Sequence, residues 1–232
     1  IVVAFEKLCL EERADLVVVV GDANSTLACA VTAKKLAIPV AHIEAGLRSR
    51  DWTLPEETNR IATDSISDYL FTPSRDANEN LLHEGVPPHR IHFVGNIMID
   101  ALLAARPKAE ERGTHLKLGL KKGGYALVTL HRPSNVDNQE TLARIMESLG
   151  GLNGSIPFIF PIHPRSRKNI DAFGLRPRLA KMPSLTLIEP LGYLDFLNLE
   201  MNSSFVLTDS GGIQEETTWL GIPCLTIREN TE

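Results

Sequence analysis

The chain has few cysteines and no long apolar run. Three cysteines, Cys9, Cys29 and Cys224, lie far apart among its 232 residues, with neither the pairing of a disulfide framework nor the spacing of metal ligands. No apolar segment reaches membrane-spanning length, and no secretory signal opens the sequence. We therefore expect a soluble, cytoplasmic protein that contacts no membrane and holds no metal ion.

A basic excess is also lacking. Aspartate and glutamate total 29 against 24 lysine and arginine residues, which excludes the broad positive surface typical of nucleic-acid binding. Any phosphate group must therefore be bound locally. Hydrophobic residues are plentiful, at 43%, enough for one large domain or two smaller ones with sizeable cores.

Apolar, β-branched runs alternate with helical patterns along the chain. The predicted strands are 16–20, 40–43, 69–71, 91–94, 126–130, 158–161, 185–188, 205–207 and 224–227. This alternation is typical of α/β proteins with parallel sheets, and it predicts two Rossmann-like domains. A polar break rich in Lys and Gly, residues 110–124, places the domain boundary between 1–112 and 113–232.

Two segments repeat the same order of parts. "LVVVVGDANSTLACAVTAKKLAIPVAHIE" and "SFVLTDSGGIQEETTWLGIPCLTIRE" each hold a strand, an Asp (Asp22 or Asp209), a helix, a Leu-x-Ile-Pro stop and another strand. Ligands of parallel sheets bind outside the carboxyl ends of the strands. We therefore expect the two sheets to face each other across a cleft, with Asp22, Glu44, His131 and Ser210 on its walls.

The stretch "LTDSGGIQEETTWLGIP" predicts a strand end, a polar elbow and a helix. Ser210 suits the N-cap, Gly211 and Gly212 expose the first helical N–H groups, and Gly221 with Pro223 ends the helix. Such a helix start can bind a phosphate. The alternative is that the glycines only pack the helix tightly against its strand.

Polar residues follow the other predicted strands as well. They are Glu44, Arg48, Glu56 and Glu57 after 40–43, His131 and Arg132 after 126–130, and His163, Arg165 and Arg167 after 158–161. Their concentration at equivalent strand ends favours a site over solvated loops.

Some of these residues also have ordinary structural interpretations. Asp22 could cap the helix that begins near Asn24, and Glu56 could suit the dipole of a helix that begins after Pro55. Capping and catalysis can coexist. Asp137 with Glu140 predicts a capping box without a catalytic role.

Six motifs in order, "GDANSTLA", "HIEAGLRS", "PEETNR", "TLHRPSNVDN", "TDSGGIQEE" and "GIPCLTIRENTE", resemble the non-hydrolysing UDP-N-acetylglucosamine 2-epimerases. The resemblance implies an isomerase that interconverts UDP-N-acetylglucosamine and UDP-N-acetylmannosamine by elimination and re-addition of UDP. It places Asp22, Glu44 and Glu56 at the acid/base positions and His131 where it supports departure of the phosphate. The order in which the carboxylates act is left open.

For UDP itself, the resemblance implies binding by Arg132, Ser210, Gly211, Gly212 and Glu216, with Glu216 on the ribose hydroxyls and no cofactor. It further implies a homodimer, a role in cell-envelope polysaccharide biosynthesis, and allosteric activation by a second UDP-N-acetylglucosamine. His163 and Arg132 match positions that bind this activator.

The family pattern is incomplete in this chain, since its opening glycine-rich loop and its closing helices have no counterpart. We therefore expect a fragment truncated at both ends, with apolar surface exposed on its first sheet and little turnover by itself. A nucleotide-sugar glycosyltransferase, a hydrolysing or diacetamido-uronate 2-epimerase and a non-catalytic sensor stay open as alternatives.

Overall fold

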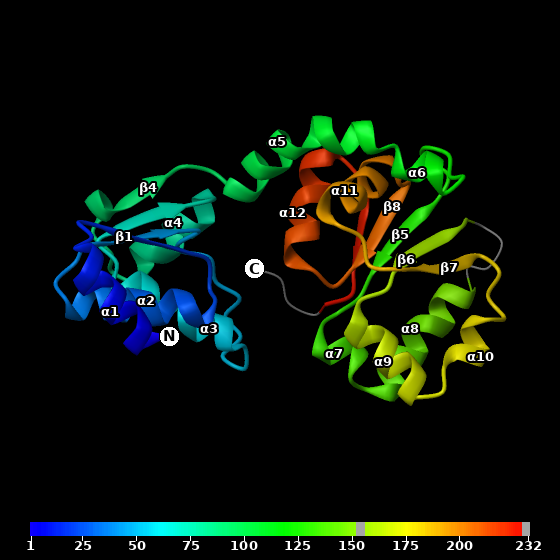
Figure 1. Ribbon diagram of the computed structural model, residues 1–232, viewed down its shortest axis with the longest axis horizontal. Helices are drawn as coiled ribbons and strands as arrows, with labels where there is room; N and C mark the ends of the chain where they lie inside the picture. The colour runs from blue at the N-terminus through cyan, green and yellow to red at the C-terminus, as the bar shows by residue number, and fades with distance from the viewer. Residues whose placement is uncertain (152–155, 229–232) are drawn as a thin grey trace. The chain divides into compact units, whose positions relative to one another are not determined.

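The computed structural model describes residues 1–151 and 156–228, and the chain forms two compact units (Figure 1). The first comprises residues 1–97, and the second begins at Met98. Each unit holds one parallel sheet. The end of the motif "GIPCLTIRENTE" lies outside the described residues.

The first unit contains a four-stranded sheet in the order β1-β2-β3-β4, and all its pairs are parallel. Its strands are β1 (Val17–Val20), β2 (Val40–Ile43), β3 (Tyr69–Thr72) and β4 (Ile91–Phe93). Its helices are α1 (Val2–Glu12), α2 (Asn24–Lys35), α3 (Pro55–Ile66) and α4 (Arg75–His83), with a 3₁₀ turn at Pro88–Arg90.

One face of this first sheet is covered by helices. Val17, Val19 and Val40 pack against residues of α1 and α2, while Leu70 packs against Leu81 of α4. Because strand side chains alternate between faces, the intervening residues point the other way. Among them Val18, Val20 and Tyr69 are 52%, 48% and 46% exposed. The exposed apolar surface predicted for the first sheet is thus present.

The second unit contains a five-stranded parallel sheet in the order β7-β6-β5-β8-β9. Its strands are β5 (Ala126–Thr129), β6 (Phe158–Pro161), β7 (Leu185–Ile188), β8 (Phe205–Thr208) and β9 (Cys224–Thr226). Its helices are α5 (Ile97–Arg112), α6 (Thr114–Lys117), α7 (Pro133–Val136), α8 (Gln139–Gly151), α9 (Pro164–Ala172), α10 (Arg176–Leu179), α11 (Tyr193–Asn202) and α12 (Gly211–Leu220).

Helices cover both faces of this second sheet (Figure 1). On one face Val128, Phe158 and Phe160 pack against residues of α7 to α10. On the other, Leu127 and Val206 pack against residues of α11 and α12. The chain builds outward from β5 to β7, then returns to the other side of β5 with β8. This reversal of strand order makes the β5–β8 boundary a switch point, where ligands of such sheets bind.

The expected α/β fold is confirmed, and each predicted strand occurs within one residue of its predicted ends. Continuous β-branched runs carried this prediction because strands buried in parallel sheets lack polar alternation. The cleft expected between the two sheets stays a prediction.

The boundary between the units lies earlier than the sequence suggested. The polar segment 110–124 predicted a division after residue 112, whereas the units divide after residue 97. Helix α5 accounts for the difference because Leu102 and Ala109 are buried against Leu197 of α11. Its apolar face therefore belongs to the second unit's core.

Candidate active site

Asp22 and Glu44 lie at the same edge of the first sheet. Strands β1 and β2 are parallel, with Val20 paired to Ile43, so Asp22 and Glu44 follow adjacent carboxyl ends. Oε2 of Glu44 lies 3.9 Å from the position that a Cβ on Gly21 would occupy. The structure thus places both predicted residues, Asp22 and Glu44, at one edge of the first sheet.

The backbone at Glu44 is unusual. Its φ of 71° is left-handed, which costs a non-glycine residue about 1–2 kcal/mol. Such a conformation persists only where the surroundings impose it. Here the amide of the following Ala45 donates to the Phe71 carbonyl at 3.0 Å, which extends the ladder past the strand end.

A buried polar network supports this loop. His42 is fully buried, and its Nδ1 lies 2.6 Å from Oδ1 of Asp64 while its Nε2 lies 2.9 Å from the Gly21 carbonyl. Each ring nitrogen of His42 therefore lies within hydrogen-bond distance of an oxygen. The other oxygen of Asp64 accepts from the Gly46 amide at 3.0 Å and pairs with Arg48 at 2.7 Å.

This network ties together the loops that carry Asp22 and Glu44. His42 holds the β1 loop through Gly21, and Asp64 holds the β2 loop through Gly46. Neither residue is predictable from sequence spacing, because their pairing spans 22 positions and depends on how α3 packs on β2. A histidine inside a predicted buried strand was the available signal.

Asp22 is held from helix α3. Its Oδ2 accepts from Nη2 of Arg60 at 2.5 Å, and its carbonyl accepts from the Asn59 side chain at 2.8 Å. Helix α2 begins at Asn24 with no side-chain cap, so the capping interpretation of Asp22 is wrong. Its carboxylate is instead 28% exposed and charge-paired.

Two adjacent glutamates at the start of α3 behave differently. Glu56 is exposed, whereas Glu57 is 1% exposed and accepts from the amides of Ser49 and Arg50 at 2.9 and 2.8 Å. Burial raises the pKa of Glu57, but these hydrogen bonds outweigh it and lower the pKa below its usual value. Glu57 therefore fixes the loop, and Glu56 is available to solvent.

In the second unit, Asp209 organises the switch point between β5 and β8. This fully buried carboxylate accepts from the amides of His131 and Arg132 at 3.1 and 2.9 Å and from Asn135 at 3.1 Å. It also pairs with Nδ1 of His131 at 2.9 Å. Burial raises the pKa of Asp209, but these donors more than compensate and lower it.

His131 is thereby oriented by its partner, while 40% of its side chain stays exposed. Nε of Arg132 donates to the Asp209 carbonyl at 3.2 Å. The His163 ring, from the end of β6, lies 6.0 Å from the His131 ring. The structure therefore brings His131, Arg132 and His163 to one edge of the second sheet.

The predicted elbow is present between β8 and α12. Helix α12 begins at Gly211 with Ser210 as N-cap, but the Ser210 side chain makes no capping hydrogen bond. A Cβ on Gly212 would lie 2.8 Å from Cε of Met98. Close packing therefore explains Gly212 at least in part, and the phosphate role of the elbow stays a prediction.

Glu216 lies on the second turn of α12 and is 4% exposed. Its Oε1 accepts from the Tyr193 hydroxyl of α11 at 3.0 Å. Burial and the neighbouring Glu216 raise the pKa of Tyr193, which keeps the phenol protonated as a donor. Tyr193 was not among the residues predicted from sequence.

The predicted capping box at Asp137 is wrong. Helix α8 begins at Gln139, and Asn138 caps it by accepting from the Thr141 amide at 2.9 Å. Asp137 instead pairs with Arg165 and accepts from Asn169 at 2.9 Å, which links the β5 and β6 loops.

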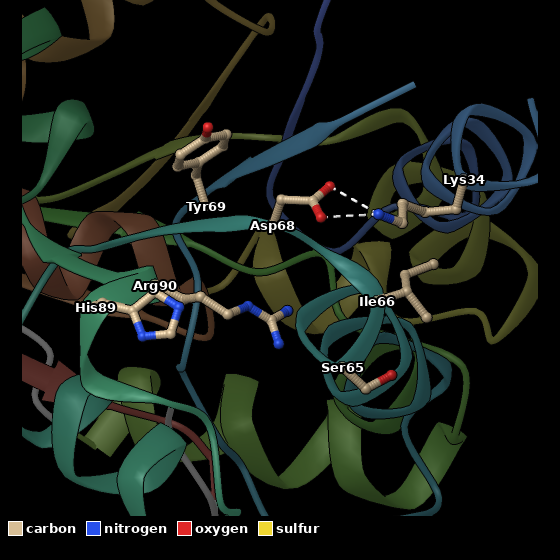
Figure 2. Close-up of a pocket in the computed structure, with 7 residues that line it drawn as sticks. All are labelled: Lys34, Ser65, Ile66, Asp68, Tyr69, His89 and Arg90. Atoms are coloured by element: carbon tan, nitrogen blue, oxygen red, sulfur yellow. Dashed lines mark hydrogen bonds and ion pairs between the residues drawn. The ribbon is translucent and has the colours of Figure 1, made fainter. Parts of the chain in front are cut away.

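A hollow of about 440 Å³ lies at the opposite edge of the first sheet, where β3 and β4 begin. Figure 2 shows Asp68 and Lys34 paired there, with His89 and Arg90 nearby. No residue predicted for the site lines it. Across 1–151 and 156–228, no three metal-binding side chains gather, and no helix has the length and apolarity for a membrane span.

Comparison with known proteins decides the family. The sequence profile described as UDP-N-acetylglucosamine 2-epimerase matches residues 1–232. The chain belongs to this family. It is 46% identical over 232 residues to the UDP-N-acetylglucosamine 2-epimerase of Methanococcus maripaludis, covering 98% of the chain and 63% of that protein. The chain therefore spans less than two thirds of the length of the curated relatives it matches, 63% and 64% for two of the most similar.

Solved structures of family members share the fold. The Methanocaldococcus jannaschii enzyme in complex with UDP-GlcNAc and UDP matches with a TM-score of 0.88 and 46% identity, over 99% of this chain and 64% of that one. The Neisseria meningitidis enzyme bound to UDP-GlcNAc matches with a TM-score of 0.89 and 32% identity, with the same coverage. A UDP-2,3-diacetamido-2,3-dideoxy-D-glucuronate 2-epimerase of Pseudomonas aeruginosa is 42% identical over 98% of the chain and 62% of its own length.

Proposed function

We propose that the natural protein carrying this sequence is a non-hydrolysing UDP-N-acetylglucosamine 2-epimerase. Family membership supports the reaction class. The observation that carries the proposal is the pair of carboxylates, Asp22 and Glu44, held at one sheet edge by a buried network that stabilises a left-handed Glu44.

The reaction requires a proton to leave carbon 2 while UDP departs from carbon 1, and then a proton to return to carbon 2 on the opposite face while UDP adds back to carbon 1. No carbonyl acidifies carbon 2 strongly, so positioned bases and acids must act in concert with the leaving group. We assign this work to Asp22, Glu44 and Glu56. Nη2 of Arg60 donates to the Asp22 carboxylate, so this contact fixes its orientation at the sheet edge.

Departure of UDP requires positive charge and hydrogen-bond donors at the diphosphate. We assign His131 to support the departing phosphate and Arg132 to bind it, with Ser210 and the amides of Gly211 and Gly212 as further donors. Glu216 is assigned to the ribose hydroxyls. Asp209 supports these assignments because it fixes the backbone of both His131 and Arg132.

Several finer properties belong to the same proposal. They are a cytoplasmic location, for which the three free cysteines are suited, a role in cell-envelope polysaccharide biosynthesis, and a homodimer activated by a second UDP-N-acetylglucosamine near His163 and Arg132. The second candidate is an epimerase of UDP-diacetamido-glucuronate, favoured by the Pseudomonas aeruginosa relative.

The proposal is tested in heavy water with UDP-N-acetylglucosamine and the natural protein. Carboxylates that meet solvent exchange the abstracted proton, so deuterium should appear at carbon 2 of the regenerated UDP-sugar. A hydrolysing enzyme would release free N-acetylmannosamine, and a glycosyltransferase or a sensor would leave carbon 2 unlabelled. A product that keeps its original proton would overturn the proposal, and faster labelling of the diacetamido-uronate would favour the second candidate.

Variants separate chemistry from binding. Glu44→Gln or Asp22→Asn should abolish labelling while UDP affinity stays within a few fold, because these groups act on the sugar. Glu216→Ala should weaken UDP binding by about 1–3 kcal/mol, measured by calorimetry, since ribose donors lose their acceptor. Loss of UDP binding in Glu44→Gln would reassign Glu44 as a ligand contact.

A further inference from the structure

A second glutamate, Glu200, lies on the helix that packs against the one carrying Glu216. Glu200 of α11 is fully buried, and α11 packs against α12. In the described part of the chain, neither oxygen of the Glu200 carboxyl has a hydrogen-bond partner, and Oε2 of Glu216 has none either. An ionised carboxylate without partners is among the most costly groups to bury.

Among the described residues, burial and the carboxyl of Glu216 are the causes that act on Glu200, and both disfavour its ionisation. Helix α5 contributes apolar residues, Leu102 and Ala109, to the core around α11. The titratable groups that act on this site are Glu216 of α12 and Tyr193 of α11. Burial, together with the facing carboxyl of Glu216, raises the pKa of Glu200 to about 9.

We propose that Glu200 is a positioning residue, which stays protonated at neutral pH and donates a hydrogen bond to Glu216. This donation would satisfy Oε2 of Glu216, just as the Tyr193 hydroxyl satisfies Oε1. The Glu216 carboxylate is then fixed from both sides and presents its remaining lone pairs to a ribose. The inference rests on the proposed UDP site, and it adds a pH dependence that the family reaction does not require.

Stability gives a test that needs no ligand. In the unfolded chain Glu200 ionises near its ordinary value of 4.5, whereas in the folded chain it ionises near 9. The stability from the protonated form is therefore complete below 4.5 and is lost as the pH rises toward 9. Denaturant unfolding between pH 5 and 10 should show this loss in the wild type and not in Glu200→Gln, which carries a neutral donor at every pH.

UDP affinity gives the second test, by calorimetry over the same pH range. Ionisation of the uracil base affects both proteins alike, so the ratio of their affinities isolates Glu200. Above pH 9 the wild type should bind UDP about tenfold more weakly relative to Glu200→Gln than at pH 7. Glu200→Met has no donor, and it should bind UDP more weakly than Glu200→Gln at pH 7.

The controls keep the outcomes distinct. Glu147→Gln removes an exposed glutamate of α8, paired with Arg178, and should match the wild type in both tests. If no protein binds UDP, the proposed function fails, while the stability test still reports on the proton. Equal pH dependence of stability in wild type and Glu200→Gln overturns the buried proton, and equal affinity of the Gln and Met variants overturns its donation to Glu216.

Discussion

At the scale of single residues, the two sheet edges use one device. A buried aspartate that belongs to neither proposed chemical step holds the loops that carry the groups proposed to react: Asp64 accepts from the Gly46 amide, and Asp209 accepts from the amides of His131 and Arg132. Past the end of a strand, backbone amides lose their partners in the sheet. Each carboxylate accepts hydrogen bonds from such amides and so satisfies them. Positioning is separated from chemistry at both edges.

The contribution of Asp209 to stability should depend on pH. Its folded pKa is lowered, so its contribution to stability is complete above the unfolded value of about 3.9 and is lost as the pH falls through the folded pKa. Asp209→Asn should lose about 1.5–3 kcal/mol or more of unfolding free energy at pH 7, because several donors face a buried carboxylate. The deficit should shrink in denaturant titrations at pH 2 to 3.

The control for this prediction is Asp137→Asn. Asp137 also has a lowered pKa, from its hydrogen bond with Arg165, but the pair lies at the surface and solvent screens it. Its replacement should change stability little at either pH. An Asp209→Asn protein whose deficit is the same at pH 7 and pH 2 would contradict the lowered pKa.

At the scale of elements, the loop after β2 depends on a close approach to α4. Gly46 has a φ of +84°, and a Cβ there would lie 2.5 Å from the Ala77 carbonyl oxygen. Gly85 has nearly the same φ, +85°, and nothing within 4 Å of its Cβ position. The left-handed backbone destabilises both alanine variants by about 1–2 kcal/mol. Only Gly46→Ala also forces the loop after β2 away from α4.

We therefore expect Gly46→Ala to be less stable than Gly85→Ala by a further 1–3 kcal/mol or so, the usual cost of overpacking. Chemical denaturation followed by circular dichroism measures the difference. Gly46→Ala should also lose labelling at carbon 2, since Glu44 lies two residues away, while Gly85→Ala should retain it. Equal stabilities would mean that α4 yields to the added methyl group.

The strands and helices were largely predictable from sequence. The contacts between them were not. Each strand was found because continuous apolar runs without polar alternation are typical of strands in parallel sheets. The start of α8 was misplaced by one residue because Asp137 and Asn138 are both good caps, and Arg165 decides between them from 28 positions away. The sequence placed the boundary after residue 112, whereas the units divide after residue 97, since a polar linker is visible in sequence but the packing partner of α5 is not.

The site shows the same limit. Motifs located Asp22, Glu44, His131 and Ser210 at strand ends, and the parallel registers place each pair at one edge of its sheet. The buried residues His42, Asp64 and Glu200 were missed, and so was the half-exposed Tyr193. Their roles depend on contacts between separate elements, which no local spacing encodes.

At the scale of the whole molecule, the proposed roles in UDP binding and in acid/base chemistry fall on different units. The groups assigned to UDP all belong to the unit that begins at Met98, and the acid/base carboxylates all belong to residues 1–97. Binding of UDP and binding of a UDP-sugar should therefore protect different parts of the chain. A ligand that binds the folded state at 100 times its Kd adds about 2.7 kcal/mol to the stability of what it holds.

Hydrogen exchange followed by mass spectrometry measures this division. UDP alone should slow exchange around His131 and across 208–216, and UDP-N-acetylglucosamine should extend protection to 21–26 and 44–60, because its sugar requires the carboxylates of the first unit. Helix α10, which packs with α7 to α9 on one face of the second sheet and lies away from the switch point, serves as an internal control and should not change. In Glu44→Gln the protection by UDP should persist, which separates binding from chemistry. If UDP alone protected both units equally, the sugar would not be what engages the first unit, and the assignment of Asp22, Glu44 and Glu56 to the sugar would fail.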